Sequence, residues 1–205
     1  MKKAAEIISF IFSPVMIPFY GFLTLIYCTY LSELPVYFII MILGIILAFT
    51  ALIPSMSLIW LHQIGAISNI DNPSREERVR PYLFSLMGYV ICIYFLIRMS
   101  FPMWMVSLLI GGCVILIFML IINKWWKISA HMAGIGAYIG LIYMLGKLRF
   151  ILPIEGLAII ILSAGLLGSC RIYLGRHTLG QVLVGTLLGF LWSCASIYVG
   201  ILLQT

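Results

Sequence analysis

Charged side chains are scarce in this sequence of 205 residues. Only 9% of its residues are charged and 64% are apolar, whereas about 25% of the residues of a soluble domain are charged. This scarcity excludes a soluble globular domain. A membrane-spanning helix needs about 20 apolar residues, so the length allows six or seven of them joined by short loops. We therefore expect one all-α, polytopic helical membrane domain over residues 1–205, with six or seven transmembrane helices.

Acidic residues and cysteines are also few. The chain has six acidic residues, and Asp71 is its single aspartate. A membrane prenyltransferase holds magnesium on clustered aspartates, so the sequence disfavours that class of enzyme. The five cysteines are scattered through apolar runs, and neither their odd number nor their spacing fits a disulfide or metal framework. The sequence therefore predicts no metal site and no cofactor.

Seven apolar runs are long enough to cross a membrane. They end at charged residues, prolines or glycines, and they lie near residues 6–30, 35–60, 81–99, 103–123, 128–146, 152–170 and 178–203. Pro14 and Pro18 either kink the first run or make it re-entrant, so six crossings and seven crossings both stay open.

Three polar segments separate these runs: His62–Arg80, Asn123–His131 and Arg171–Gln181. Two predicted spans lie between each polar segment and the next, and an even number of crossings returns the chain to the same face. We therefore expect all three segments on one side of the bilayer. Each segment alone fits an ordinary solvated loop, but together they bring histidines and arginines within reach of one another, which favours a shared functional site.

The third polar segment contains a candidate nucleophile. His177 and Gln181 are spaced i, i+4, so they share a face if a helix starts here, and Gly175 can supply the turn before it. An imidazole that attacks phosphorus needs one ring nitrogen free and the other held by an acceptor, a role that the amide oxygen of Gln181 can fill. Arg171 then fits a phosphate clamp, because its planar guanidinium matches two oxygens.

The second polar segment contains a candidate acid. Ser129 and the amides that follow it open an apolar run, and a helix N-terminus presents free N–H groups to anions. His131 is placed to protonate a leaving oxygen. His62 stands at the end of a predicted span, where a contact with lipid headgroups explains it, and we leave it out of the site.

These segments resemble the type 2 phosphatidic acid phosphatases, membrane enzymes that share their catalytic core with vanadium haloperoxidases. The pattern of that family is Lys-x6-Arg-Pro, then Pro-Ser-Gly-His, then Ser-Arg-x5-His-x3-Asp. Arg171-x5-His177 matches the spacing of the third motif, with Gln181 in place of the aspartate. Ser129-Ala-His131 matches the second motif, with alanine in place of glycine.

The first motif is looser than the other two. Arg80 precedes a proline as the pattern requires, but Pro73 occupies the position of the lysine. Arg75 and Arg78 offer cations in its place, and a register that pairs Arg75 with Arg78 fits equally well. The resemblance implies that these three arginines, with Ser129 and Arg171, bind the substrate phosphate.

The resemblance implies a metal-independent phosphatase that hydrolyses a phosphate monoester or diphosphate on a lipid of the phosphatidate, phosphatidylglycerophosphate, lipid A or polyprenyl diphosphate class. His177 would be the nucleophile, Gln181 its orienting group and His131 the acid. A non-catalytic lipid-phosphate binder or transporter on a diverged phosphatase fold is the alternative, because Gln181 is neutral and the first motif is altered.

The expected partners are a lipid phosphate and the bilayer. The net charge is +6, but the basic residues stand at span ends and in loops, where they face lipid headgroups, so we expect no nucleic acid. We expect a bacterial cytoplasmic (inner) membrane protein. The positive-inside rule and the usual extracytoplasmic site of bacterial family members disagree, so the membrane side of the site stays open, as does the oligomeric state.

Overall fold

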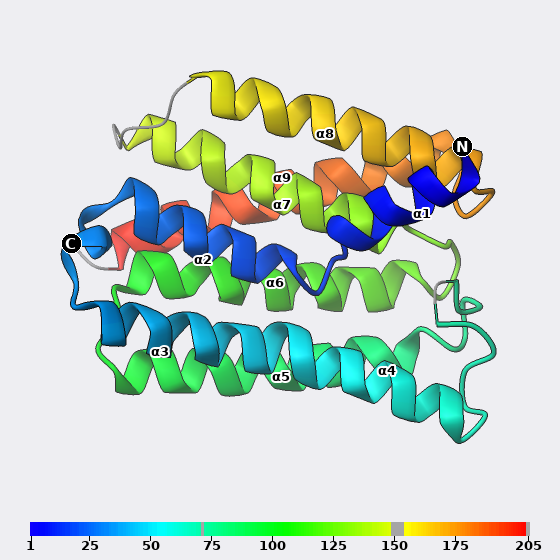
Figure 1. Ribbon diagram of the computed structural model, residues 1–205, viewed down its shortest axis with the longest axis horizontal. Helices are drawn as coiled ribbons and strands as arrows, with labels where there is room; N and C mark the ends of the chain where they lie inside the picture. Colours follow the sequence, from blue (N-terminus) through cyan, green and yellow to red (C-terminus); the bar gives the residue numbers. More distant parts are fainter. Residues whose placement is uncertain (71, 149–153, 204–205) are drawn as a thin grey trace.

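A computed structural model describes residues 1–70, 72–148 and 154–203 (Figure 1). The protein is all-helical, with 79% of its residues in helices and no strand among those described. Its helices are α1 (Lys2–Ile11), α2 (Ile17–Cys28), the 3-10 helix η1 (Tyr30–Glu33), α3 (Val36–Leu47), the π-helix η2 (Ala48–Leu52), α4 (Ile53–Gln63), α5 (Val79–Arg98), α6 (Met103–Ile122), α7 (Ala130–Lys147), α8 (Ile154–Tyr173) and α9 (Leu179–Leu202).

Five helical segments are long and apolar enough to cross a membrane, judged by length and composition: Val36–Gln63, Val79–Arg98, Met103–Ile122, Glu155–Tyr173 and Leu179–Leu202. The first of them is continuous through α3, η2 and α4. The helical class and the membrane character predicted from composition are therefore present in the structure. The predicted start of the sixth apolar run, at residue 152, lies outside the described residues.

The predicted run 6–30 is not one helix. α1 ends at Ile11 and α2 begins at Ile17, and Ser13 and Pro14 stand in the turn between them. Pro14 has no N–H to donate and its ring crowds the preceding turn, so it interrupts the helix that the apolar run alone would allow. α1 packs against α8, and α2 packs against α3 and α7.

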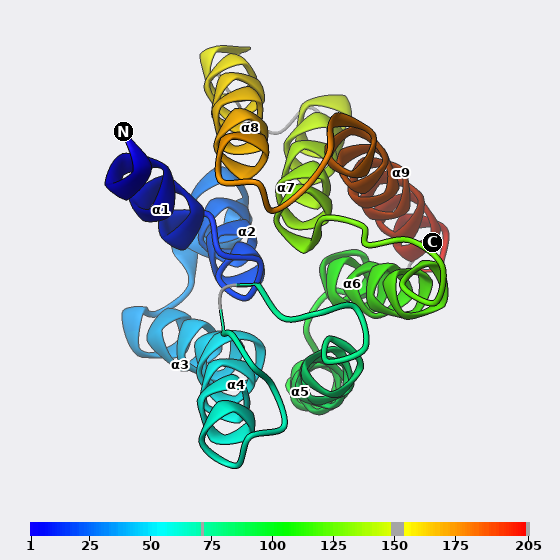
Figure 2. The same ribbon diagram turned by 90° about the vertical axis from the view of Figure 1, so that its right-hand side faces the viewer.

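Successive long helices run in opposite directions, so alternate connections lie at the same end of the bundle (Figure 1). The described residues of three connections, 64–70 with 72–78, 123–129 and 174–178, lie with the N-terminus at the right-hand end of that view. Figure 2 looks at the molecule from this end and shows the three connections around a common centre. The helix order thus brings the three polar segments together, as the even number of intervening runs predicts.

Close packing of α7 against α9 fixes the geometry of this end. A Cβ on Gly136 would overlap the carbonyl oxygen of Thr186, and one on Gly189 would overlap that of Ala133. Gly185 similarly faces the backbone of Ser129. Such small residues let two membrane helices approach closely. As a result, the first turn of α7 lies beside the second and third turns of α9.

Candidate active site

His177 stands in the turn between α8 and α9. Gly175 adopts φ 64°, a left-handed conformation that glycine takes without strain, and the helix ends before it. Thr178 then caps α9, and its hydroxyl accepts the backbone N–H of Gln181 at 3.4 Å. The spacing Thr-x-x-Gln is that of a capping box, so the local sequence fixes where α9 begins and where His177 sits.

Gln181 holds the ring of His177 in one tautomer. Its Oε1 accepts the backbone N–H of Thr178 at 3.2 Å, which orients the amide with its oxygen toward the turn. The same oxygen lies 3.0 Å from Nδ1 of His177. Because this oxygen can only accept, Nδ1 must carry the proton, and the lone pair of the ring then resides on Nε2. The backbone amide thereby prevents the flipped orientation that would present the amide nitrogen to the ring.

His177 is buried, and its side chain is 7% exposed. Burial, and after it the nearby Arg78 guanidinium, lower the pKa of its imidazole to about 4, although the bond to Gln181 opposes both effects. The ring is therefore neutral at physiological pH, which is the state in which Nε2 can act as a nucleophile.

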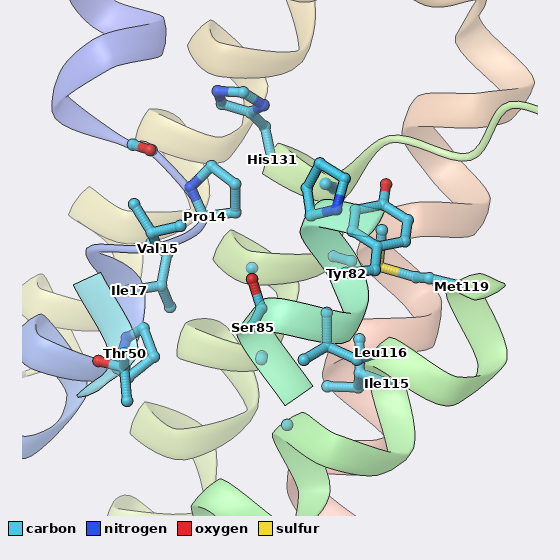
Figure 3. Close-up of a pocket in the computed structure, with 18 of the residues that line it drawn as sticks. Pro14, Val15, Ile17, Thr50, Tyr82, Ser85, Ile115, Leu116, Met119 and His131 are labelled. Carbon is cyan, nitrogen blue, oxygen red and sulfur yellow. The ribbon is translucent and has the colours of Figure 1, made fainter. Parts of the chain in front are cut away.

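A cavity of about 470 Å³ opens beside His177. Its polar end is formed by two histidines and three arginines: His131, His177, Arg78, Arg171 and Arg176. Figure 3 shows His131 at one end of this cavity, with Ser85 and Leu116 further along it. The described lining contains a single carboxylate, that of Glu6. The polar end thus carries an excess of positive charge and suits an anion.

Arg78 is the arginine of the first polar segment that reaches this cavity. Its Nε donates to the carbonyl of Pro73 at 3.2 Å and its Nη1 to that of Ile128 at 3.1 Å, which ties two polar segments together. Arg78 is 6% exposed and Arg171 is 4% exposed, so both guanidinium groups are buried. Two buried guanidinium groups beside an imidazole have the charge and the geometry to bind a phosphate.

The pKa of Lys127 responds to the positive charge of the nearby arginines. Burial lowers the pKa of its amine, and the surrounding Arg78, Arg176 and Arg171 lower it further. Its Nζ donates to Oδ1 of Asn72 at 2.8 Å. Lys127 of the second segment therefore lies near arginines of the first and third segments.

Four of the predicted site residues do not line the cavity, although one of them, Gln181, is bonded to His177. Arg75 donates to the carbonyl of Trp125 at 3.1 Å, Arg80 is exposed, and neither belongs to the cavity lining. Ser129 is fully buried at the start of α7, and its hydroxyl has no hydrogen-bond partner among the described residues. The structure therefore brings together His177, Gln181, His131, Arg171 and Arg78, and leaves the other three outside.

Other residues reach the cavity that the sequence did not single out. Arg176, Tyr82 and Glu6 belong to its lining, and Ser9 of α1 lies near the ring of His131. Tyr82 follows Arg78 by four residues, a helical spacing visible in the sequence. Ser9 and Glu6 had no such indication, because they reach the site only through the break between α1 and α2.

No metal-binding cluster is apparent in the part of the chain that the structure describes, where no three His, Cys, Asp or Glu side chains are grouped. Compared with known proteins, the chain matches no family model and has no significant match to a curated protein or a solved structure. The fold and site define the class of protein: a helical, membrane-type bundle with a buried histidine–arginine site at one end.

Proposed function

We propose that this protein is a membrane-embedded lipid phosphatase that hydrolyses a phosphate monoester or diphosphate on a lipid through a phosphohistidine intermediate. The observation that carries the proposal is the arrangement of His177, whose Nδ1 is held by Gln181 while Nε2 keeps its lone pair beside two buried arginines. The motif order of the type 2 phosphatidic acid phosphatases supports the same chemistry.

In the first step, Nε2 of His177 attacks phosphorus and the bond between phosphorus and the lipid oxygen breaks. His131 gives a proton to the departing oxygen, and the negative charge of the bound phosphate favours the protonated form of His131 that this step needs. Arg78 and Arg171 balance the charge of the phosphoryl oxygens in the transition state.

In the second step, water attacks the phosphorus of the intermediate. His131, now neutral, takes a proton from that water, the bond from nitrogen to phosphorus breaks, and inorganic phosphate leaves. His177 returns to its neutral state, with its Nδ1 proton still held by Gln181. Arg75, Arg80 and Ser129 lie off the cavity lining and have no part in this mechanism.

A non-catalytic lipid-phosphate binder or transporter is the second candidate. Gln181 favours it, because a neutral amide stabilises the positive ring of a phosphohistidine less than a carboxylate does. The same buried arginines and cavity would serve binding without turnover.

We further infer six or seven crossings of a bacterial cytoplasmic (inner) membrane. α7 has 18 residues and is about 27 Å long, close to the roughly 30 Å of a hydrocarbon core, so it adds a sixth crossing to the five candidate spans. The α1–α2 pair, broken at Pro14, would be the seventh.

The test is phosphate release from short-chain lipid phosphates by the purified protein in EDTA. We expect turnover by the wild type and none by His177→Ala, with the two proteins equally folded by circular dichroism. Binding without turnover in the wild type would favour the second candidate, and a His177→Ala variant that keeps its activity would remove His177 as the nucleophile.

A further inference from the structure

The cavity beside His177 extends well beyond the groups that contact a phosphate. From His131, its lining follows one face of α7 through Gly134, Ala137 and Leu141. Ten residues of helix separate His131 from Leu141, which corresponds to about 15 Å. That depth is about half of a roughly 30 Å hydrocarbon core, or one leaflet of a bilayer.

The rest of the cavity wall comes mainly from α2, η2, α4, α5 and α6. The α5 residues Tyr82, Ser85 and Tyr89 lie on the same helical face as Arg78, and Leu108 and Leu116 of α6 also belong to the lining. Figure 3 shows Ser85 pointing into the space between these helices, with Ile115 and Leu116 at the end away from His131. Charged groups line one end of the cavity, and mainly apolar groups and hydroxyls line the rest.

The cavity volume limits what can occupy this space. A heavy group such as a methylene takes up about the volume of one water molecule, roughly 30 Å³, so 470 Å³ holds about 15 such groups. A phosphate accounts for five of them, which leaves room for about ten carbons. One chain of moderate length fits this space, and a second chain of similar length does not.

We propose that the substrate is a single-chain lipid phosphate or diphosphate, with an alkyl or isoprenoid chain whose first ten or so carbons lie in the cavity between α2, α4, α5, α6 and α7. This inference rests on the proposed function, since it assigns a substrate class to the same site. Lipids that carry two chains beside the phosphate are poor substrates, because the second chain has no space within the cavity.

Ala137 of α7 and Ser85 of α5 provide the test, because both have small side chains that line the cavity midway along it. Leucine at residue 137 adds three carbons, or about 90 Å³, and so removes about a fifth of the volume. Ala158→Leu on the exposed side of α8 adds the same bulk away from the cavity and is the matched control.

The assay compares n-alkyl phosphates of four to sixteen carbons with dioctanoyl phosphatidate at equal concentration. Phosphate release and thermal stabilisation by each compound are measured on the same protein. For the wild type we expect release to rise with chain length to about ten carbons, and octyl phosphate to be preferred over dioctanoyl phosphatidate by about tenfold or more. In Ala137→Leu the preferred length should fall by about three carbons, whereas Ala158→Leu should keep the wild-type preference and the wild-type release from butyl phosphate. Ser85→Leu on α5 should shorten the preferred length as Ala137→Leu does.

Several outcomes would overturn the proposal. One is equal hydrolysis of one-chain and two-chain lipids by the wild type. Another is a preferred chain length that changes no more in Ala137→Leu and Ser85→Leu than it does in Ala158→Leu. If no compound releases phosphate, the proposed hydrolysis fails separately, and the thermal stabilisation decides this inference. The cavity is supported as a one-chain site if thermal stabilisation depends on chain length and if the chain length that stabilises best is shorter in the two cavity variants. Thermal stabilisation that is independent of chain length refutes it.

Discussion

The bond between Gln181 and His177 gives the sharpest test of the proposed mechanism. Gln181→Leu removes the oxygen that lies 3.0 Å from Nδ1. A hydrogen bond contributes about 1 kcal/mol when the ring is neutral and about 1.5–3 kcal/mol when it is charged, and only the difference raises the barrier. A difference of about 0.5–2 kcal/mol corresponds to a rate about 2- to 30-fold slower, with any loss of ring orientation added to it.

Gln181→Glu is the complementary change. It keeps an acceptor for both Nδ1 and the Thr178 amide, and it adds a negative charge beside a ring whose pKa is about 4 in the wild type. An adjacent opposite charge favours the charged form and raises the pKa by about one to three pH units. Since the nucleophile must be neutral, the acid limb of the wild-type profile should lie near pH 4, and the Glu variant should lose activity at a correspondingly higher pH on that limb.

The assay is the pH–rate profile of phosphate release for the wild type and both variants, with melting temperatures measured in parallel. Thr178→Ala controls for the helix cap, because it removes the hydroxyl that accepts the N–H of Gln181 and leaves the bond to His177 in place. Loss of a cap costs about 1 kcal/mol of stability. Thr178→Ala should therefore melt earlier and keep its rate. A fully active Leu variant, together with a Glu variant whose acid limb stays near pH 4, would show that another group orients the nucleophile.

Two further predictions concern the other groups at the polar end. Arg171→Lys should reduce turnover by about tenfold or more, because a lysine keeps the charge of the buried guanidinium but loses its paired contacts. Arg176 is less buried, so the turnover of Arg176→Lys should stay within about threefold of the wild-type value. Equal tolerance at both positions would argue against a phosphate clamp at Arg171. His131→Gln should slow phosphate release from alkyl phosphates by about 100-fold. Phosphate release from nitrophenyl phosphate should slow much less, because a nitrophenolate leaves without a proton. Equal losses on both substrates would exclude His131 as the acid.

The helical class and the meeting of the polar segments were predictable from the sequence. Apolar runs of this length can only be satisfied as helices in a membrane, and two runs between consecutive polar segments bring each one back to the same end. The bond between His177 and Gln181 follows from their spacing of four residues. The signal that fixes the amide, the Thr-x-x-Gln capping box, is also present in the sequence but escaped the prediction.

The choice among the three arginines of the first segment depends on helical phase. α5 begins one residue after Arg78, and the positions that line the cavity, 78, 82, 85 and 89, recur every three to four residues on one face. Arg80 is about 200° around the helix from Arg78 and therefore faces away. The family motif aligns Arg80 with its proline but carries no information on where α5 starts, so the motif alone could not select Arg78.

The break between α1 and α2 was the least predictable feature that bears on the site. Its apolar composition is that of one span, and only Pro14 and Pro18 indicated an interruption, which the structure places at Pro14. The consequence is chemical as well as structural, because the break lets Glu6 and Ser9 reach a polar end that otherwise contains cations and imidazoles.

The same arrangement explains how a neutral residue can occupy the orienting position. A carboxylate orients a histidine by charge from either oxygen, whereas an amide must present its oxygen. Here the N–H of Thr178 selects that oxygen, and the packing of α7 against α9 keeps the turn in place. Orientation is therefore supplied by the backbone of the capping box, and stabilisation of phosphoryl charge is left to Arg78 and Arg171. If this division of roles is correct, the neutral amide limits how strongly the charged ring is stabilised without disturbing where Nε2 points.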